Sequence, residues 1–149
     1  MTLYLVLDEN IIVLSAKVQN DQGNDDNTCT QLISDILKNE DNIRCTVKLF
    51  EKYTKKLKDL EVTVHSTAYT VKLLNLLRAA GLINFWNNNP IELLGENMLP
   101  PDDVYLVRLV ANSKTDLVST DLRLKSKMGG AKIFENYKIK FLLPNEVYN

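Results

Sequence analysis

A short apolar segment near the start of the chain runs directly into two acidic residues. Residues 3–7 read LYLVL, and Asp8 and Glu9 follow without a gap. A short, apolar, β-prone run of this kind predicts a buried strand. A carboxylate at the end of a buried strand loses much of its hydration, so it needs either a partner charge or a chemical purpose. Asp8 is therefore the first candidate for a functional side chain.

Strand-like and helix-like segments alternate along the rest of the chain. We predict further strands at 43–45, 116–119 and 139–143, and helices at 11–18, 28–38, 46–58, 66–80 and about 102–113. Thr46 and Ser66 are predicted helix caps, and the segments 19–27, 84–101 and 126–130 are predicted loops. This alternation predicts an α/β fold with three layers, α/β/α, around a central, mainly parallel sheet. The 149 residues are expected to form one domain over 1–149.

The charge balance and the few histidine and cysteine residues limit the classes of function. The chain has 18 Lys+Arg against 19 Asp+Glu, which neither indicates nor excludes a nucleic-acid-binding protein. A single histidine, His65, excludes a His-rich zinc site and argues against a Ser-His-Asp triad. Two cysteines without metal-finger spacing indicate reduced thiols. No apolar run reaches the roughly 20 residues of a membrane span, and no signal peptide is evident. We therefore predict a cytoplasmic protein without a membrane partner.

Several acids occupy places where parallel α/β sheets carry their sites. Asp8 and Asp121 each follow a predicted strand, whereas Asp102 and Asp103 open a predicted helix. Glu51 lies among the apolar residues of its helix, so we expect it to face the edge of the sheet and not the solvent. Ligands of open parallel sheets bind beyond the carboxyl ends of the strands. These acids are therefore expected to gather at one edge.

Gathered carboxylates repel one another and remain ionised only beside a cation. Two unit charges about 4 Å apart interact by about 4 kcal/mol at an effective dielectric constant of about 20. Oxygen ligands without histidine or cysteine favour Mg²⁺ or Mn²⁺ over zinc. Such ions stabilise the attacking and leaving oxygens of a phosphodiester displacement. The acids therefore predict a site for metal-assisted hydrolysis.

Four motifs in this order resemble those of PIN-domain ribonucleases, a family that includes VapC-like toxins. Asp8-Glu9-Asn10 is similar to the family's D-T-N motif, and residues 46–51 (TVKLFE) to its helix with an embedded Glu. Residues 101–107 (PDDVYLV) resemble its helix-opening acids. Residues 115–124 (TDLVSTDLRL) resemble its strand followed by an acid. This sequence departs from the family's motifs at three residues: Glu9 and Ser119 each stand where the family has Thr, and Thr46 stands where it has Ser. Its loop at 19–27 is also longer than in compact members.

The resemblance implies a function and a set of site residues. It implies a metal-dependent endoribonuclease that hydrolyses RNA through Mg²⁺ or Mn²⁺ and uses no protein nucleophile. The implied catalytic metal ligands are Asp8, Glu51, Asp103 and Asp121. Asn10 and Ser119 would orient these ligands by hydrogen bonds, with Asp102 and Asp116 as alternates or helpers. The implied partners are RNA, an antitoxin protein if the chain is the toxin of a toxin–antitoxin pair, and a second copy of the chain in a homodimer.

Basic residues near Asp121 are the candidates for RNA contact. They are Lys114, Arg123, Lys125 and Lys127, and lysine and arginine side chains of this kind bind the phosphate backbone. Taken singly, the acids also have ordinary structural explanations. Asp102, Asp103 and Asp121 are suited to capping helices or turns, and Glu51 is spaced to pair with Lys55 on an exposed helix face.

Two other functions remain open from the sequence. The first is a non-catalytic protein of the same fold that acts by protein interaction. The second is a receiver domain, which also begins with a strand ending in paired acids. A receiver needs a phospho-acceptor Asp after a strand near residue 50, where the sequence predicts a helix. Nucleotide binding through a glycine-rich loop is set aside because Gly129-Gly130 is the only glycine pair.

Overall fold

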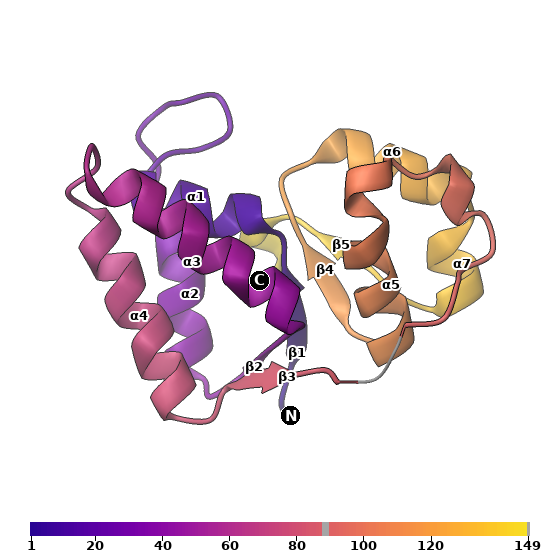
Figure 1. The fold of residues 1–149 in the computed structure, drawn as a ribbon, viewed down its shortest axis with the longest axis horizontal. Helices are drawn as coiled ribbons and strands as arrows, with labels where there is room; N and C mark the ends of the chain where they lie inside the picture. The colour runs from indigo at the N-terminus through magenta and orange to yellow at the C-terminus, as the bar shows by residue number, and fades with distance from the viewer. Residues whose placement is uncertain (88–89, 149) are drawn as a thin grey trace.

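Five short strands form one parallel sheet in the computed structural model of the chain, which describes residues 1–87 and 90–148 (Figure 1). The strands are β1 (Tyr4–Leu7), β2 (Asn42–Cys45), β3 (Ile83–Phe85), β4 (Asp116–Val118) and β5 (Phe141–Leu142). Their order across the sheet is β3-β2-β1-β4-β5, and every neighbouring pair is parallel. The α/β fold with a parallel central sheet is therefore confirmed.

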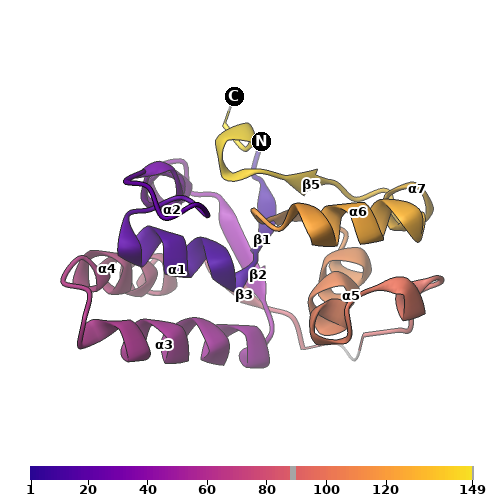
Figure 2. The ribbon, with the colours of Figure 1, turned by 90° about the horizontal axis from the view of Figure 1, so that it is seen from above.

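Helices cover both faces of this sheet (Figure 2). The helices α1 (Glu9–Lys17), α2 (Thr28–Lys38), α3 (Val47–Glu61) and α4 (Thr67–Ala79) lie on one face. The helices α5 (Val104–Ser113), α6 (Leu122–Gly130) and α7 (Ile133–Tyr137) lie on the other. Right-handed crossovers explain this division, because the chain moves outward from β1 to β3 and then crosses to β4 and β5 on the opposite side.

The reversal of strand order fixes where a ligand site belongs. It falls between β1 and β4, which pair with Leu7 opposite Val118. The residues that follow these two strands, Asp8 and Ser119, therefore emerge side by side at the carboxyl edge of the sheet. Helices α1 and α6 then leave toward opposite faces at this position, which is where ligands bind in open α/β sheets.

The buried face of each element comes from regularly spaced apolar residues. Strand β1 contributes Leu5, Val6 and Leu7, each at most 1% exposed, as expected for a strand covered on both faces. Helix α3 buries Leu49, Tyr53 and Leu57, which recur at every fourth position. The Tyr53 hydroxyl donates a hydrogen bond to the Leu7 carbonyl, so α3 is attached to the end of β1.

No helix in the described part of the chain is long and apolar enough to cross a membrane.

The structure differs from the predicted secondary structure in a few places. Residues 126–130 form the end of α6 and not a loop, because Leu124 and Met128 are buried one helical turn apart. The glycine pair suggested a loop, but the spacing of these two apolar residues decides the structure. Strand β3 and helix α7 were missed because each is very short. Thr46 caps α3 as predicted, accepting a hydrogen bond from Leu49 N at 3.1 Å, whereas the Ser66 hydroxyl donates to the Ala16 carbonyl instead of capping α4.

Candidate functional site

Asp8 is a buried carboxylate held between β1 and β4. Its backbone N–H donates to the Val118 carbonyl at 2.9 Å, so the backbone of Asp8 extends the sheet pairing. The side chain is only 6% exposed. Its Oδ2 accepts a hydrogen bond of 2.7 Å from the hydroxyl of Ser119, which is itself fully buried. Within the described part of the chain, the side-chain hydrogen-bond partner of Asp8 is thus the neutral hydroxyl of Ser119.

This environment makes Asp8 a weaker acid than usual. Burial raises the pKa of Asp8 from its ordinary value of 3.8 to about 6, and the Ser119 hydrogen bond opposes part of that rise. The negative charges of Asp103 and Glu9 raise the pKa further. Like charges act on one another in this way only when they lie close together. Asp8 is therefore close in space to Asp103, which is distant from it in sequence.

Ser119 also connects Asp8 to Asp121. The Ser119 Oγ donates to Asp8 and accepts a hydrogen bond of 3.0 Å from the backbone N–H of Asp121. The Oδ1 atom of Asp121 accepts from Leu124 N at 3.0 Å and so caps α6. The structural explanation of Asp121 as a cap is confirmed, and the backbone N–H of Asp121 binds the same hydroxyl as the Asp8 carboxylate.

Asp103 comes from the face of the sheet that α5 and α6 cover. It ends a single 3-10 turn, Pro101–Asp103, and directly precedes α5. Burial is the largest cause of its raised pKa, followed by the charges of Asp121, Asp102 and Glu9. The charge of Asp103 thus acts on Asp8, and that of Asp121 acts on Asp103, although the three acids come from separate parts of the chain. Glu9 adds a fourth negative charge at their margin.

Glu51 does not share this environment. Its side chain is exposed, so the expectation that it faces the sheet edge is wrong. The reason is helical geometry: Glu51 lies two residues from both Leu49 and Tyr53, which places it on the opposite side of α3 from these buried residues. Its charge is not among those that shift the pKa values of Asp8 and Asp103. The proposed role of Glu51 as a metal ligand stays a prediction.

Helix α3 instead presents lysines toward the acids, a feature that the motifs did not predict. The Lys52 Nζ lies 4.3 Å from the centre of the Tyr105 ring, and the Lys48 Nζ lies 4.5 Å from it. Tyr105 follows Asp103 closely, and the positive charge of Lys52 lowers the pKa of Asp103. The signal in the sequence was the spacing of Lys48 and Lys52, which places them one turn apart beside Leu49 and Tyr53.

The remaining predicted residues occupy different places. Asn10 and Asp102 are exposed at the margin of the site. Asp116 opens β4, opposite Leu5, and its Oδ1 accepts a hydrogen bond of 3.1 Å from Lys140 N. It therefore lies at the other end of the strand from Asp121 and is not brought to the acids. The predicted RNA-binding residues are all exposed, three of them on α6: Lys114, Arg123, Lys125 and Lys127.

The chemistry of the three grouped acids suits a hard divalent cation. Their donors are carboxylate oxygens, which Mg²⁺ and Mn²⁺ prefer. In the part of the chain that the structure describes, no three Asp, Glu, His or Cys side chains converge into a ready-made metal group. Binding an ion would therefore require these carboxylates to move closer together. Neither a scan against protein-family models nor a search of curated proteins finds a match to this chain.

Replacing Ser119 tests the hydrogen bonds of the site. We expect Ser119→Ala to raise the pKa of Asp8 above about 6, because the bond that favours its ionised form is removed. The free energy of unfolding at neutral pH should fall by about 1–3 kcal/mol, since a buried carboxylate and the Asp121 N–H both lose a partner. An NMR titration of the Asp8 carboxyl and denaturant unfolding measure the two effects. The exposed Ser126→Ala on α6 is the control, and equal behaviour of the two variants would contradict this account.

Proposed function

We propose that this chain is a metal-dependent ribonuclease that hydrolyses phosphodiester bonds at the edge formed by β1 and β4. The observation that carries the proposal is the grouping of Asp8, Asp103 and Asp121 at the position where the strand order reverses. A carboxylate buried beside others destabilises the folded protein, so its presence is best explained by a cation that it binds during function. The resemblance to PIN-domain ribonucleases in the motifs around these residues supports the same activity.

The residues divide the chemical work as follows. Asp8, Asp103 and Asp121 would hold Mg²⁺ or Mn²⁺. A bound ion of this kind supplies a Lewis acid for the phosphoryl oxygens and lowers the pKa of a water molecule. Ser119 positions the Asp8 carboxylate through its hydrogen bond. Lys52, which lies on α3 and contacts the ring of Tyr105, offers a positive charge to a phosphate that approaches the acids.

Cleavage assays with selected variants test this proposal. We expect wild-type protein to cleave a mixture of single-stranded and structured RNAs with Mn²⁺ or Mg²⁺, and not with EDTA. Asp103→Asn should reduce cleavage by more than about 100-fold, because it removes a proposed ligand. The matched variant Glu51→Gln should retain cleavage to within about twofold, since Glu51 is exposed and outside the group. Loss of cleavage in Glu51→Gln would instead place Glu51 among the ligands.

A non-catalytic interaction protein of the same fold is the second candidate. The observation that favours it is that Asp121, one of the three acids, has an ordinary structural role as the cap of α6. The two candidates differ in their response to divalent ions. Absence of Mn²⁺ binding in a calorimetric titration, together with absence of cleavage, would favour the interaction protein. RNA as substrate, an antitoxin partner and a homodimer belong to the ribonuclease proposal.

Basic residues of α6 are proposed to hold the RNA backbone next to the acids. Arg123 and Lys125 are exposed and follow Asp121 directly in the first turns of the helix. We expect the double charge reversal Arg123→Glu with Lys125→Glu to weaken RNA binding by about tenfold or more at low salt. The slope of log affinity against log salt should decrease by about 1 for each phosphate that the protein no longer neutralises. Fluorescence anisotropy at several salt concentrations measures both. An unchanged slope would show that these residues do not bind phosphate.

A further inference from the structure

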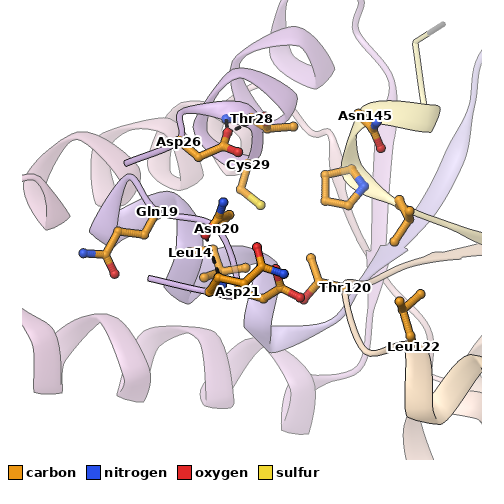
Figure 3. A pocket seen from close by; sticks show the side chains of 13 residues that line it. Leu14, Gln19, Asn20, Asp21, Asp26, Thr28, Cys29, Thr120, Leu122 and Asn145 are labelled. Carbon is orange, nitrogen blue, oxygen red and sulfur yellow. Dashed lines mark hydrogen bonds between the residues drawn. The ribbon is translucent and has the colours of Figure 1, made fainter. Parts of the chain in front are cut away.

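A cavity of about 320 Å³ lies next to the acids, within the range of small-molecule sites. One wall comes from the loop between α1 and α2, including Asn20 and Asp21 (Figure 3). The facing wall comes from Leu122 and Asn145, and the sulfur of Cys29 points into the space between the walls. The cavity thus lies between the polar loop that appeared long in the sequence and the segments that follow β4 and β5.

The loop that forms the first wall has a defined structure. The Asn20 Oδ1 atom accepts hydrogen bonds from the backbone N–H groups of Gln22 and Asn24, each at 3.0 Å. The Asn20 N–H donates to the Asn24 carbonyl at 2.9 Å, and Gly23 permits the turn with a φ of 81°. An isolated antiparallel bridge between Gln19 and Asp25 closes the loop. The wall is therefore held in place before any ligand arrives.

The lining residues select a class of ligand. None of the described residues that line the cavity is Lys or Arg, and Asp21 and Asp26 are acidic, so the lining disfavours a phosphate or another anion. Leu14, Leu122 and Leu143 provide apolar surface, whereas Gln22 and Asn145 provide side-chain amides at the rim. No hydrogen bond within the described structure engages either of these two amides. Apolar surface with amide donors and acceptors at its edge fits a flat, uncharged ring with a polar edge, which describes a nucleobase.

The cavity is placed to receive a base whose phosphate lies at the acids. Thr120 lines the cavity, and it lies between Ser119, which binds Asp8, and the acid Asp121. The cavity wall and the proposed phosphodiester site are therefore formed by adjacent residues of the chain. The cations of α6 begin at Arg123, just after Leu122 of the cavity. Phosphate contacts and base contacts would thus come from successive residues of one segment.

We propose that this cavity binds one nucleobase of the RNA substrate, so that Gln22 and Asn145 give the enzyme a preference for certain bases next to the cleaved bond. The preference rests on the proposed ribonuclease function, whereas the occupation of the cavity by a base does not require cleavage. The loop at 19–27 then serves as the specificity element of the site.

Binding of mononucleotides measured by NMR tests the cavity separately from cleavage. Isotope-labelled protein is titrated with AMP, CMP, GMP and UMP, and with ribose 5-phosphate, which has the sugar and phosphate but no base. We expect at least one mononucleotide to shift the amide signals of Gln22, Thr120 and Asn145, and ribose 5-phosphate to leave them unchanged. The double variant Gln22→Ala with Asn145→Ala should bind that nucleotide about three- to tenfold more weakly for each hydrogen bond removed. The control Asn97→Ala with Asn136→Ala removes two exposed amides outside the cavity.

The outcomes separate this proposal from the ribonuclease itself. Unshifted cavity signals with all four mononucleotides, or equal shifts with ribose 5-phosphate, would overturn the base site even if the protein cleaves RNA. Shifted cavity signals that weaken in the double variant alone would establish the base site even if no metal supports cleavage. In that second case the cavity stands as a nucleotide site, and the ribonuclease proposal fails on the cleavage assay.

Discussion

Replacing Asp8 by Asn is expected to abolish RNA cleavage and, at the same time, to stabilise the protein. Cleavage with Mn²⁺ should fall by more than about 100-fold, because the most deeply buried of the proposed ligands loses its charge. The amide is isosteric with the carboxylate and still accepts the Ser119 hydrogen bond, so the fold should be retained. Opposite changes in activity and stability are the mark of a residue kept for function.

The stability gain has a defined pH dependence in the metal-free protein. The pKa of Asp8 is raised from 3.8 to about 6 in the folded state, so the folded protein binds this proton more tightly than the unfolded chain. Above pH 6 the ionised Asp8 therefore costs up to about 3 kcal/mol of stability. As pH falls through 6 toward 3.8, the wild type regains that stability.

Thermal unfolding in EDTA measures this difference. At a pH above about 7, Asp8→Asn should unfold about 4–8 °C higher than wild type, after allowance for the cost of burying an amide N–H. Below about pH 3 Asp8→Asn should no longer be more stable than wild type, because Asp8 is then neutral in both the folded and the unfolded states. The exposed Asp59→Asn on α3 serves as the control and should show neither effect, because the charge of Asp59 is not among those that shift the pKa values of Asp8 and Asp103. A variant less stable than wild type at all pH values would contradict the proposed strain at Asp8.

Reversing the charge of Lys52 is expected to strengthen metal binding and weaken RNA cleavage. Lys52 lies over Tyr105 and beside Asp103 and Glu9, where its positive charge competes with a bound cation. Lys52→Glu replaces the repulsion between Lys52 and a bound cation by an attraction, and it provides a further carboxylate on α3 near the cation. We expect Mn²⁺ affinity to rise by about tenfold for a charge change at this range. Cleavage should fall by about 100-fold, because the positive charge of Lys52 no longer stabilises the negative charge on the phosphate in the transition state.

Calorimetry and cleavage assays read the two effects of Lys52→Glu separately. The control is Lys55→Glu, an exposed charge reversal further along α3. It changes the net charge of the protein equally and should alter metal affinity by less than about twofold. Equal effects of the two variants would show that net charge, and not the position of Lys52, determines metal binding.

The sequence predicted the sheet and the acids that follow its strands more closely than it predicted the helix faces. LYLVL and the residues before Asp121 read as buried strands because apolar, β-prone runs have few other structural explanations. The location of Asp8 and Asp121 at one edge is predictable once the sheet is parallel, because every strand of a parallel sheet ends at the same edge. Their meeting across a shared Ser119 hydroxyl depended on the β1–β4 pairing, which a single sequence does not specify.

Glu51 and Lys52 show that a motif alone does not fix which side of a helix a residue occupies. Adjacent residues on a helix are separated by about 100°, so a one-residue choice decides whether a side chain faces the site or the solvent. The resemblance favoured Glu51, whereas the burial of Leu49 and Tyr53 turns Lys52 toward Tyr105. The loop at 19–27 was recognised as polar, but the cavity beside it was not predictable, because its facing wall comes from residues near the end of the chain.

The three acids differ in how firmly the backbone holds them. The backbone of Asp8 is part of the sheet through its bond to Val118, whereas Asp103 and Asp121 lie outside the sheet, at the starts of α5 and α6. An incoming ion would meet one fixed ligand and two that adjust to its radius. Mg²⁺ requires nearly ideal octahedral coordination at about 2.0–2.1 Å. Adjustable ligands also accommodate a somewhat larger ion, so the site should discriminate weakly between Mg²⁺ and Mn²⁺, and the supply of each ion would decide which one it holds.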